Sequence, residues 1–272
     1  MRCALFAAAL ALVAGCAELG VVSDGTSVSL GKPSNGQIVD GVKLPNQGDG
    51  YFTRDRWRTR NNRYGIEELV SLIKSVASRV QAASHGPRLV VADLSGRGGG
   101  PVHTWHRSHQ SGRDVDLVYF MLDKDGKPFE AEAMYELLPD GTAKDGSGMR
   151  LDIPRTWRLV RELLTAHEAT VQFVFMYAPF AEMLAEHAEK RGEPAALILR
   201  ARKAMKQPGD SALHNDHMHV RIFCPKADRA FGCQDFGPLD LRVEREAEDA
   251  ALEAAARNAP VDAITPAIPP SS

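Results

Sequence analysis

Six of the nine histidines in this 272-residue chain lie in two short stretches, HTWHRSHQSGRDVD and, much later in the chain, HNDHMH. In the first stretch, His109 and Asp116 flank a glycine turn that leads into a predicted strand. In the second, His217 and His219 alternate onto one face of another predicted strand. Two such strands can present imidazoles and a carboxylate to a common point. Two histidines, one carboxylate and an open position suit a catalytic Zn²⁺, whose fourth ligand is water.

The motifs HxxHQxGRDVD and HNDHMHV resemble those of the penicillin-insensitive murein endopeptidases. These enzymes belong to the wider LAS class of lysostaphin-type, D-Ala-D-Ala carboxypeptidase and hedgehog-like zinc folds. The similarity covers roughly residues 50–225 and is most specific at the motif residues. It implies an LAS/hedgehog-like zinc peptidase fold.

The resemblance also implies roles for individual residues. His109, Asp116 and His219 would bind one Zn²⁺ per chain. His217 would be the general base or stabilise the transition state, with His214 assisting it. A neighbouring imidazole suits this work because its pKa lies near the working pH.

Four further residues belong to the same stretches. His106 is expected to line the site. Asp114 could orient a ligand through a hydrogen bond, or it could simply be a buried strand carboxylate, and Asp216 has the same two interpretations. Gly112 is expected to serve the turn between the first histidines and the strand.

The expected activity is that of an exported zinc metallo-endopeptidase that hydrolyses peptide cross-links of peptidoglycan. The resemblance implies cleavage of the D-alanyl to meso-diaminopimelyl bond, with some LD activity possible. The nearest alternative is a D,D- or L,D-carboxypeptidase with the same metal centre. A non-catalytic zinc-containing cell-wall-binding module and a non-haem Fe(II) oxygenase are further alternatives, disfavoured by the extra histidines and by export, respectively.

Hydrophobic periodicity predicts the elements that must position these side chains. Strands and helices mix without a regular βαβ rhythm, which favours an α+β fold with a central antiparallel sheet and flanking helices. Helical spacing of apolar residues predicts helices at 63–83, 154–168, 179–191, 194–206 and 241–257. Strands are expected at 88–93, 114–120, 169–177 and 217–223.

The N-terminal sixteen residues, MRCALFAAALALVAGC, are typical of a secretory signal peptide. Their end resembles the lipobox of bacterial lipoproteins, in which Cys16 would carry lipid. We therefore expect a periplasmic protein anchored to the outer membrane through Cys16. The alternative is a signal peptide cut a few residues later, which would give a soluble periplasmic protein.

The predicted organisation places a linker or loose N-terminal arm at residues 17–50 and a zinc metallopeptidase domain at 51–240. A C-terminal helix and a disordered tail follow at 241–272. In an exported protein the pair Cys224 and Cys233 is expected to form a disulfide. A formal net charge of −2 argues against a nucleic-acid partner, which would require a basic stripe. The sequence does not indicate an oligomeric state.

Overall fold

A computed structural model describes residues 27–103, 106–209 and 211–258. The expectations for the signal segment, for lipidation of Cys16 and for a disordered tail after residue 258 lie outside the described residues. Among the described residues, no helix combines the length and the apolar character needed to cross a membrane.

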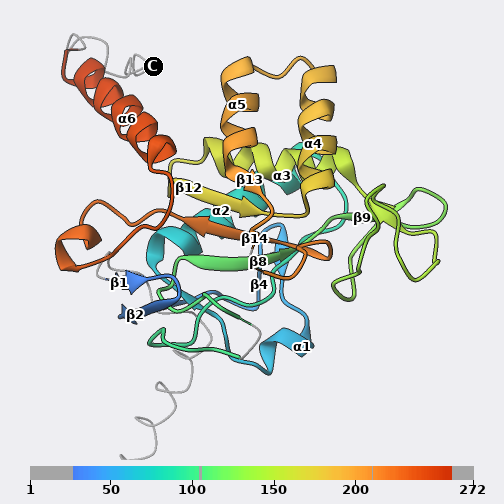
Figure 1. Ribbon diagram of the computed structural model, residues 1–272, viewed down its shortest axis with the longest axis horizontal. Helices are drawn as coiled ribbons and strands as arrows, with labels where there is room; N and C mark the ends of the chain where they lie inside the picture. The colour runs from blue at the N-terminus through green and yellow to red at the C-terminus, as the bar shows by residue number, and fades with distance from the viewer. Residues whose placement is uncertain (1–26, 104–105, 210, 259–272) are drawn as a thin grey trace, which may run out of the picture.

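The helices occur mostly in the second half of the chain (Figure 1). They are α1 (Asp55–Arg58), α2 (Glu67–Ala83), α3 (Ile153–Thr165), α4 (Ala178–Lys190), α5 (Ala195–Ala204), the short 3₁₀ helix η1 (Asp228–Phe231) and α6 (Asp240–Asn258). The strands of the first half are β1 (Val28–Lys32), β2 (Asn35–Val39), β3 (Val42–Lys43), β4 (Gln47–Gly48), β5 (Tyr51–Phe52), β6 (Tyr64–Gly65), β7 (Leu89–Val90) and β8 (Asp114–Val118). Those of the second half are β9 (Met121–Leu122), β10 (Pro128–Phe129), β11 (Arg150–Leu151), β12 (Val171–Phe175), β13 (Met205–Lys206) and β14 (His217–Ile222).

A four-stranded sheet in the order β13-β12-β14-β8 is the largest sheet of the described chain. Strands β12, β14 and β8 pair antiparallel, whereas β13 joins the edge of β12 in parallel. Smaller sheets of two or three strands surround it. The expected α+β class is therefore confirmed. The purely antiparallel central sheet is corrected, because the short strand after α5 enters the sheet in the same direction as β12. The LAS/hedgehog-like fold stays a prediction.

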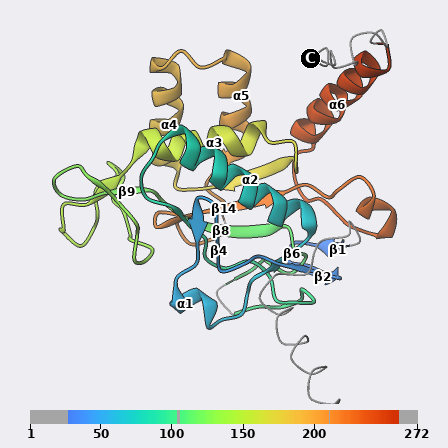
Figure 2. The same ribbon diagram turned by 180° about the vertical axis from the view of Figure 1, so that it is seen from behind.

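The two faces of this sheet differ in chemistry. On β14, Met218 and Val220 are fully buried in the hydrophobic core, whereas His217 and His219 point to the opposite side. Helices α2 and α3 cross one face of the sheet, as the view from behind shows (Figure 2). The sheet is therefore packed on its helical side and presents histidines on the other.

Helix α2 shows how the sequence sets this packing. Its first turn carries two glutamates, which favour a helix N-terminus, and the backbone N–H of Glu67 donates to the Ser27 hydroxyl at 2.8 Å. Apolar side chains recur every three or four residues along one face and are buried, at Leu69, Ile73, Val76 and Val80.

The N-terminal segment differs from its prediction. A linker or loose arm is expected over residues 17–50, but residues 27–50 form strands β1 to β4. Strands β1 and β2 make an antiparallel hairpin, and Ser29 and Leu44 are fully buried. The segment is rich in glycine, serine and asparagine because its strands are short and its turns are tight, so it lacks a sustained hydrophobic period.

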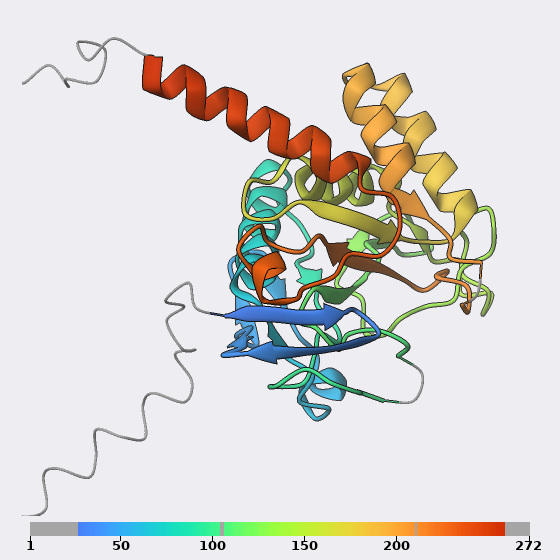
Figure 3. The same cartoon turned by 60° about the vertical axis from the view of Figure 1, so that its left-hand side comes forward.

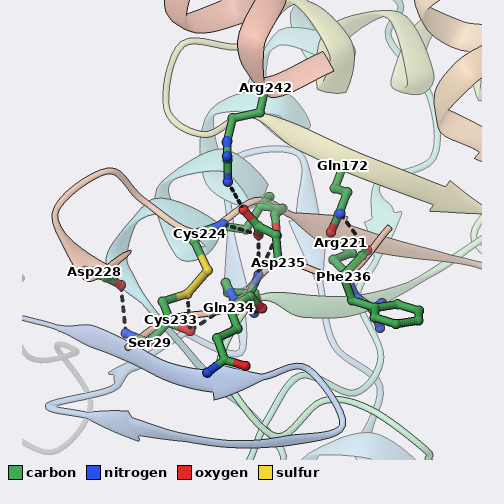
Figure 4. A network of polar contacts seen from close by, with 12 residues as sticks. Ser29, Gln172, Arg221, Cys224, Asp228, Cys233, Gln234, Asp235, Phe236 and Arg242 are labelled. Carbon is green, nitrogen blue, oxygen red and sulfur yellow. Dashed lines mark hydrogen bonds and ion pairs between the residues drawn. A yellow bond between two sulfur atoms is a disulfide. The ribbon is translucent and has the colours of Figure 1, made fainter. Parts of the chain in front are cut away.

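The predicted disulfide between Cys224 and Cys233 is confirmed (Figure 4). It lies beside Asp235, whose carboxylate accepts hydrogen bonds from the Cys224 backbone N–H at 2.8 Å and from Arg113 at 3.1 Å. Arg242 of α6 also bonds Asp235, at 2.5 Å. This network ties the start of α6 to the residue preceding β8. Beyond that start, α6 extends away from the body of the protein (Figure 3).

Candidate metal centre

Five of the six histidines of the two motifs meet on the face of the four-stranded sheet opposite to the helices; they are His106, His109, His214, His217 and His219. In the register of β14 and β8, His219 lies opposite Asp116. On the other side of β8, the backbone N–H of Asp116 donates to the Asp93 carbonyl, and the N–H of Ala92 donates to the Asp116 carbonyl, both at 2.9 Å. Asp116 is thus enclosed between β14 and the segment that follows β7, and it is 2% exposed.

His109 enters from the turn that precedes β8. Its backbone has φ of 66°, in the left-handed region that non-glycine residues rarely adopt. Gly112, with φ of 76°, completes the turn, as predicted. The ring of His109 donates its Nδ1–H to the Leu94 carbonyl at 3.2 Å, which leaves Nε2 3.2 Å from Asp116 Oδ1.

His219 is oriented by a carboxylate. It donates its Nε2–H to Asp114 Oδ1 at 2.7 Å, and Asp114 also accepts from Arg221 at 2.7 Å. The remaining ring nitrogen, Nδ1, lies 3.4 Å from Asp116 Oδ1. Of the two interpretations of Asp114, the geometry agrees with the one in which it orients a ligand, because bonding the outer nitrogen directs the inner one to the centre.

His217 and His214 lie beside this pair. His217 donates its Nδ1–H to Asp216 at 2.6 Å, and its Nε2 lies 3.6 Å from Asp116 Oδ1. The ring of His214 lies 5.2 Å from that of His217 and 6.0 Å from that of His219, between centroids.

His106 approaches Asp116 from the opposite side. It donates its Nε2–H to Asp93 at 3.1 Å, and its Nδ1 lies 3.8 Å from Asp116 Oδ2. Asp93 also accepts from Arg60 at 2.5 Å and is fully buried. The carboxylate of Asp93 therefore fixes the ring of His106.

These contacts leave buried polar atoms that a metal ion would satisfy. In the described structure, neither His109 Nε2 nor Asp116 Oδ1 has a hydrogen-bond partner, although both are buried. Such atoms are costly to leave unpaired. The ligand atoms of His106, His109 and Asp116 lie within 4.8 Å of one another, close enough to hold a metal ion. Two of the three expected ligands belong to this set, whereas His219 lies outside it, although its Nδ1 is 3.4 Å from Asp116 Oδ1. Imidazole and carboxylate ligands fit zinc.

The charges of the centre point the same way. Burial alone would raise the pKa of Asp116, but the imidazoles around it, led by His109 and His217, lower it well below its ordinary value. Burial lowers the pKa of His219 to about 4 against the opposing effect of its bond to Asp114, so this ring is neutral near pH 7. Burial alone would lower the pKa of His109, but its contact with Asp116 and the charges of Asp116, Asp114 and Asp93 together raise it. The ionised carboxylate of Asp116 thus favours positive charge beside it, and a bound cation would provide that charge.

Burial, followed by the charges of His217 and His219, lowers the pKa of His214 to about 4. At His217 the neighbouring charges have a larger combined effect on the pKa than burial has. Burial favours the neutral ring, but Asp116 and Asp216 outweigh it and raise the pKa of His217. Two neighbouring imidazoles therefore hold protons with very different strength.

The five histidines, Asp114 and Asp116 expected at the site all lie in this region, and the structure adds three residues that were not predicted as site residues. Asp93 is the last residue of the predicted strand 88–93, and only its pairing with β8 brings it to His106. Arg221 shares a strand face with the histidines, and Phe175 lies opposite His219 on β12. Both residues lie in predicted strands, so the alternation of side chains along each strand could have placed them on the face that bears the histidines.

Comparisons with known proteins agree with this geometry. Residues 29–263 match the family model described as penicillin-insensitive murein endopeptidase. A protein of that name from Haemophilus influenzae is 28% identical over 79% of this chain and 70% of its own length. A protein of the same name from Escherichia coli is 29% identical over 84% of this chain and 80% of its own length. Another, from Klebsiella pneumoniae, is 27% identical over 79% of this chain and 72% of its own length.

Proposed function

Because the chain belongs to the penicillin-insensitive murein endopeptidase family, it is a peptidase that hydrolyses peptide cross-links of peptidoglycan, and we propose that it cleaves the D-alanyl to meso-diaminopimelyl bond with one Zn²⁺. The proposed ligands are His109, Asp116 and His219. The observation that supports them is that hydrogen bonds occupy the outer nitrogen of each ring and leave the inner nitrogens of both within 3.4 Å of the same carboxylate oxygen.

Zinc bound at such a centre polarises a peptide carbonyl and lowers the pKa of water towards neutrality. The protein itself orients the reacting groups. Asp114 fixes the ring of His219, and the Leu94 carbonyl fixes that of His109. Both hydrogen bonds also select the tautomer, so that the nitrogen facing the centre carries the lone pair.

We assign proton transfer to His217. Asp216 accepts its Nδ1–H, so Nε2 is the atom that exchanges a proton on the side of the substrate. The raised pKa of His217 suits a group that accepts a proton from water and then gives it to the leaving amine. His214, with its pKa lowered to about 4, stays neutral beside it and can accept or donate a hydrogen bond without adding charge.

This chemistry has no acyl-enzyme. A β-lactam inhibits by acylating a nucleophilic side chain, and hydrolysis by an activated water leaves no such group to acylate. The proposed mechanism therefore accounts for insensitivity to penicillin.

Digestion of purified muropeptide dimers tests the proposal. The zinc-loaded protein should convert dimers joined through the D-alanyl to meso-diaminopimelyl bond into monomers with intact termini, measured by mass spectrometry of the products. Loss of only a terminal D-Ala would instead assign a D,D-carboxypeptidase. Intact dimers after prolonged digestion, with zinc bound, would favour a non-catalytic module. LD-linked dimers, run in parallel, measure any LD activity.

An enzyme acting on murein works in the cell envelope. Within the envelope we propose that it is lipid-anchored to the outer membrane through Cys16, on the strength of the lipobox-like sequence alone. Several acyl chains on that cysteine would make release from the membrane slow.

A further inference from the structure

One line of side chains crosses all four strands of the sheet that bears the metal centre. Lys206 of β13 lies beside Phe175 of β12, Phe175 lies opposite His219 of β14, and His219 lies opposite Asp116 of β8. Paired residues on neighbouring strands share a face. The line therefore runs from the proposed zinc ligands outwards to a cation at the edge of the sheet.

The outer half of this line belongs to an aromatic platform, made of Phe173, Phe175, Arg221 and Lys206. The two phenylalanine rings stack with centroids 4.7 Å apart, and the ring of Phe175 lies 5.4 Å from that of His219. Phe173 is buried against Gly237, so the ring of the platform that a substrate can reach is the half-buried Phe175. The guanidinium of Arg221 lies 5.2 Å from the Phe175 ring, and Lys206 Nζ lies 5.8 Å from the Phe173 ring. The platform is thus continuous with the metal centre.

The two cations of the platform differ in what they bind. Arg221 is nearly buried and donates to Asp114 at 2.7 Å. Lys206 is exposed, and its charge acts on Asp240, but none of the ion pairs among the described residues joins it to a carboxylate. By contrast, Lys203, three residues earlier, bonds Glu244 at 2.6 Å and Asp240 at 3.1 Å. Lys206 is therefore the cation of this platform that is available to a substrate.

We propose that the aromatic platform binds one arm of the peptidoglycan stem peptide, with an ionised carboxylate of that arm paired to Lys206. Two strand spacings separate Lys206 from His219, which is roughly 10 Å, or about three residues of extended peptide. Stem peptides carry free carboxylates on the diaminopimelyl and glutamyl residues within this distance of the cross-link. The inference rests on the proposed function and adds a binding site and the charge that this site recognises.

Steady-state kinetics on two cross-linked dimers test the proposal, one with free carboxylates and one with these groups amidated. Lys206→Gln should raise KM for the free dimer by about threefold to tenfold with kcat unchanged, as expected for loss of one partly exposed charge pair. Lys206→Arg should restore most of the affinity. For the amidated dimer, wild type and Lys206→Gln should have equal KM, because the substrate no longer carries the charge.

Lys190→Gln, which removes an exposed lysine paired with Glu186 on α4, is the matched control and should leave both constants unchanged. Thermal melting and zinc content verify that each variant is folded and loaded. An unchanged KM in Lys206→Gln overturns the inference while wild-type cleavage upholds the proposed function. An equal rise in KM for both dimers also overturns it. If wild type cleaves neither dimer, the proposed function fails and the inference fails with it.

Discussion

Around Asp116, four imidazole rings face one buried carboxylate. A hydrogen bond on the side away from Asp116 orients each ring. Leu94 and Asp114 leave free nitrogens on His109 and His219. Asp216 does the same for His217, and Asp93 accepts a hydrogen bond from the ring of His106. Type and spacing alone cannot distinguish ligands from a base here. The distances to Asp116 Oδ1 favour His109 and His219 over His217, by a few tenths of an ångström.

Removing single ligands tests this order. His109→Ala, Asp116→Ala and His219→Ala should each abolish stoichiometric zinc, because three protein ligands are the minimum for a catalytic zinc site. His106→Ala should retain zinc, since its nitrogen lies farther from the carboxylate, at 3.8 Å. Elemental analysis after dialysis measures the metal content. Retention in His219→Ala together with loss in His106→Ala would exchange the two roles.

The base is tested separately from the metal. His217→Ala should keep its zinc and lose hydrolysis by about 10²–10⁴-fold, the usual contribution of general acid–base catalysis. Muropeptide digestion gives the rate, and elemental analysis of the same preparation gives the metal content. If zinc and activity disappear together, His217 is a ligand.

At the scale of elements, the long periodic segments could be predicted from the sequence. The helix expected over 63–83 is α2, and the strand expected over 217–223 is β14, with His217 and His219 on one face as the alternation indicated. The short elements could not be predicted. Strands β3 to β5 contain two residues each, too few to show a period, and β1 and β2 are rich in glycine and polar residues, so they lack the apolar character of β8 and β12.

The same limit applies to the site. Asp93 lies in a predicted strand, but its role depends on the pairing of its segment with β8, a contact between distant parts of the chain. The sequence pattern of a single strand does not indicate which distant strand it pairs with. The two motifs instead carry their own strand and turn signals, so their residues could be assigned to one face before the structure was known.

The disulfide-closed segment is an element whose contribution can be measured. Replacing both cysteines, as Cys224→Ser with Cys233→Ser, should lower the free energy of unfolding by about 2–3 kcal/mol, because the loop between them is short. Denaturant unfolding of wild type and the double variant measures the difference. Zinc content and activity should be retained at low temperature, since neither sulfur lies at the metal centre. Equal stability of the two proteins would show that the Asp235 hydrogen bonds hold the segment without the covalent link.

At the scale of the whole molecule, the folded unit begins before the predicted boundary at residue 51. Arg113 is fully buried next to β8 and donates to the Ser29 hydroxyl at 3.0 Å and to the Gly31 carbonyl at 3.4 Å. The N-terminal hairpin thus supplies partners for a buried charge, and such partners are expensive to remove.

A chain of residues 51–258 should therefore fail to fold or should melt far below a chain of residues 27–258. Loss of β1 and β2 exposes apolar core and leaves Arg113 donors unpaired, each at a cost of about 1–3 kcal/mol. Circular dichroism against temperature, with and without added zinc, compares the two chains. Equal melting temperatures would restore the predicted domain start at residue 51.

The contact between the hairpin and the disulfide segment also has a mechanical consequence. Gly31 receives a hydrogen bond from Gln234 at 2.9 Å and donates one to Gly232 at 3.1 Å, on either side of Cys233. Tension applied at the N-terminal end, as a membrane tether would apply it, enters the folded unit at β1 and passes into a covalently closed loop. This loop follows β14 directly, and Arg113, which precedes β8, is also bonded to β1 and to Asp235, so the load is shared between the covalent loop and these contacts. The Cys224–Cys233 bond therefore places a covalent link, and not strand pairing alone, between the N-terminal hairpin and the sheet that bears the histidines.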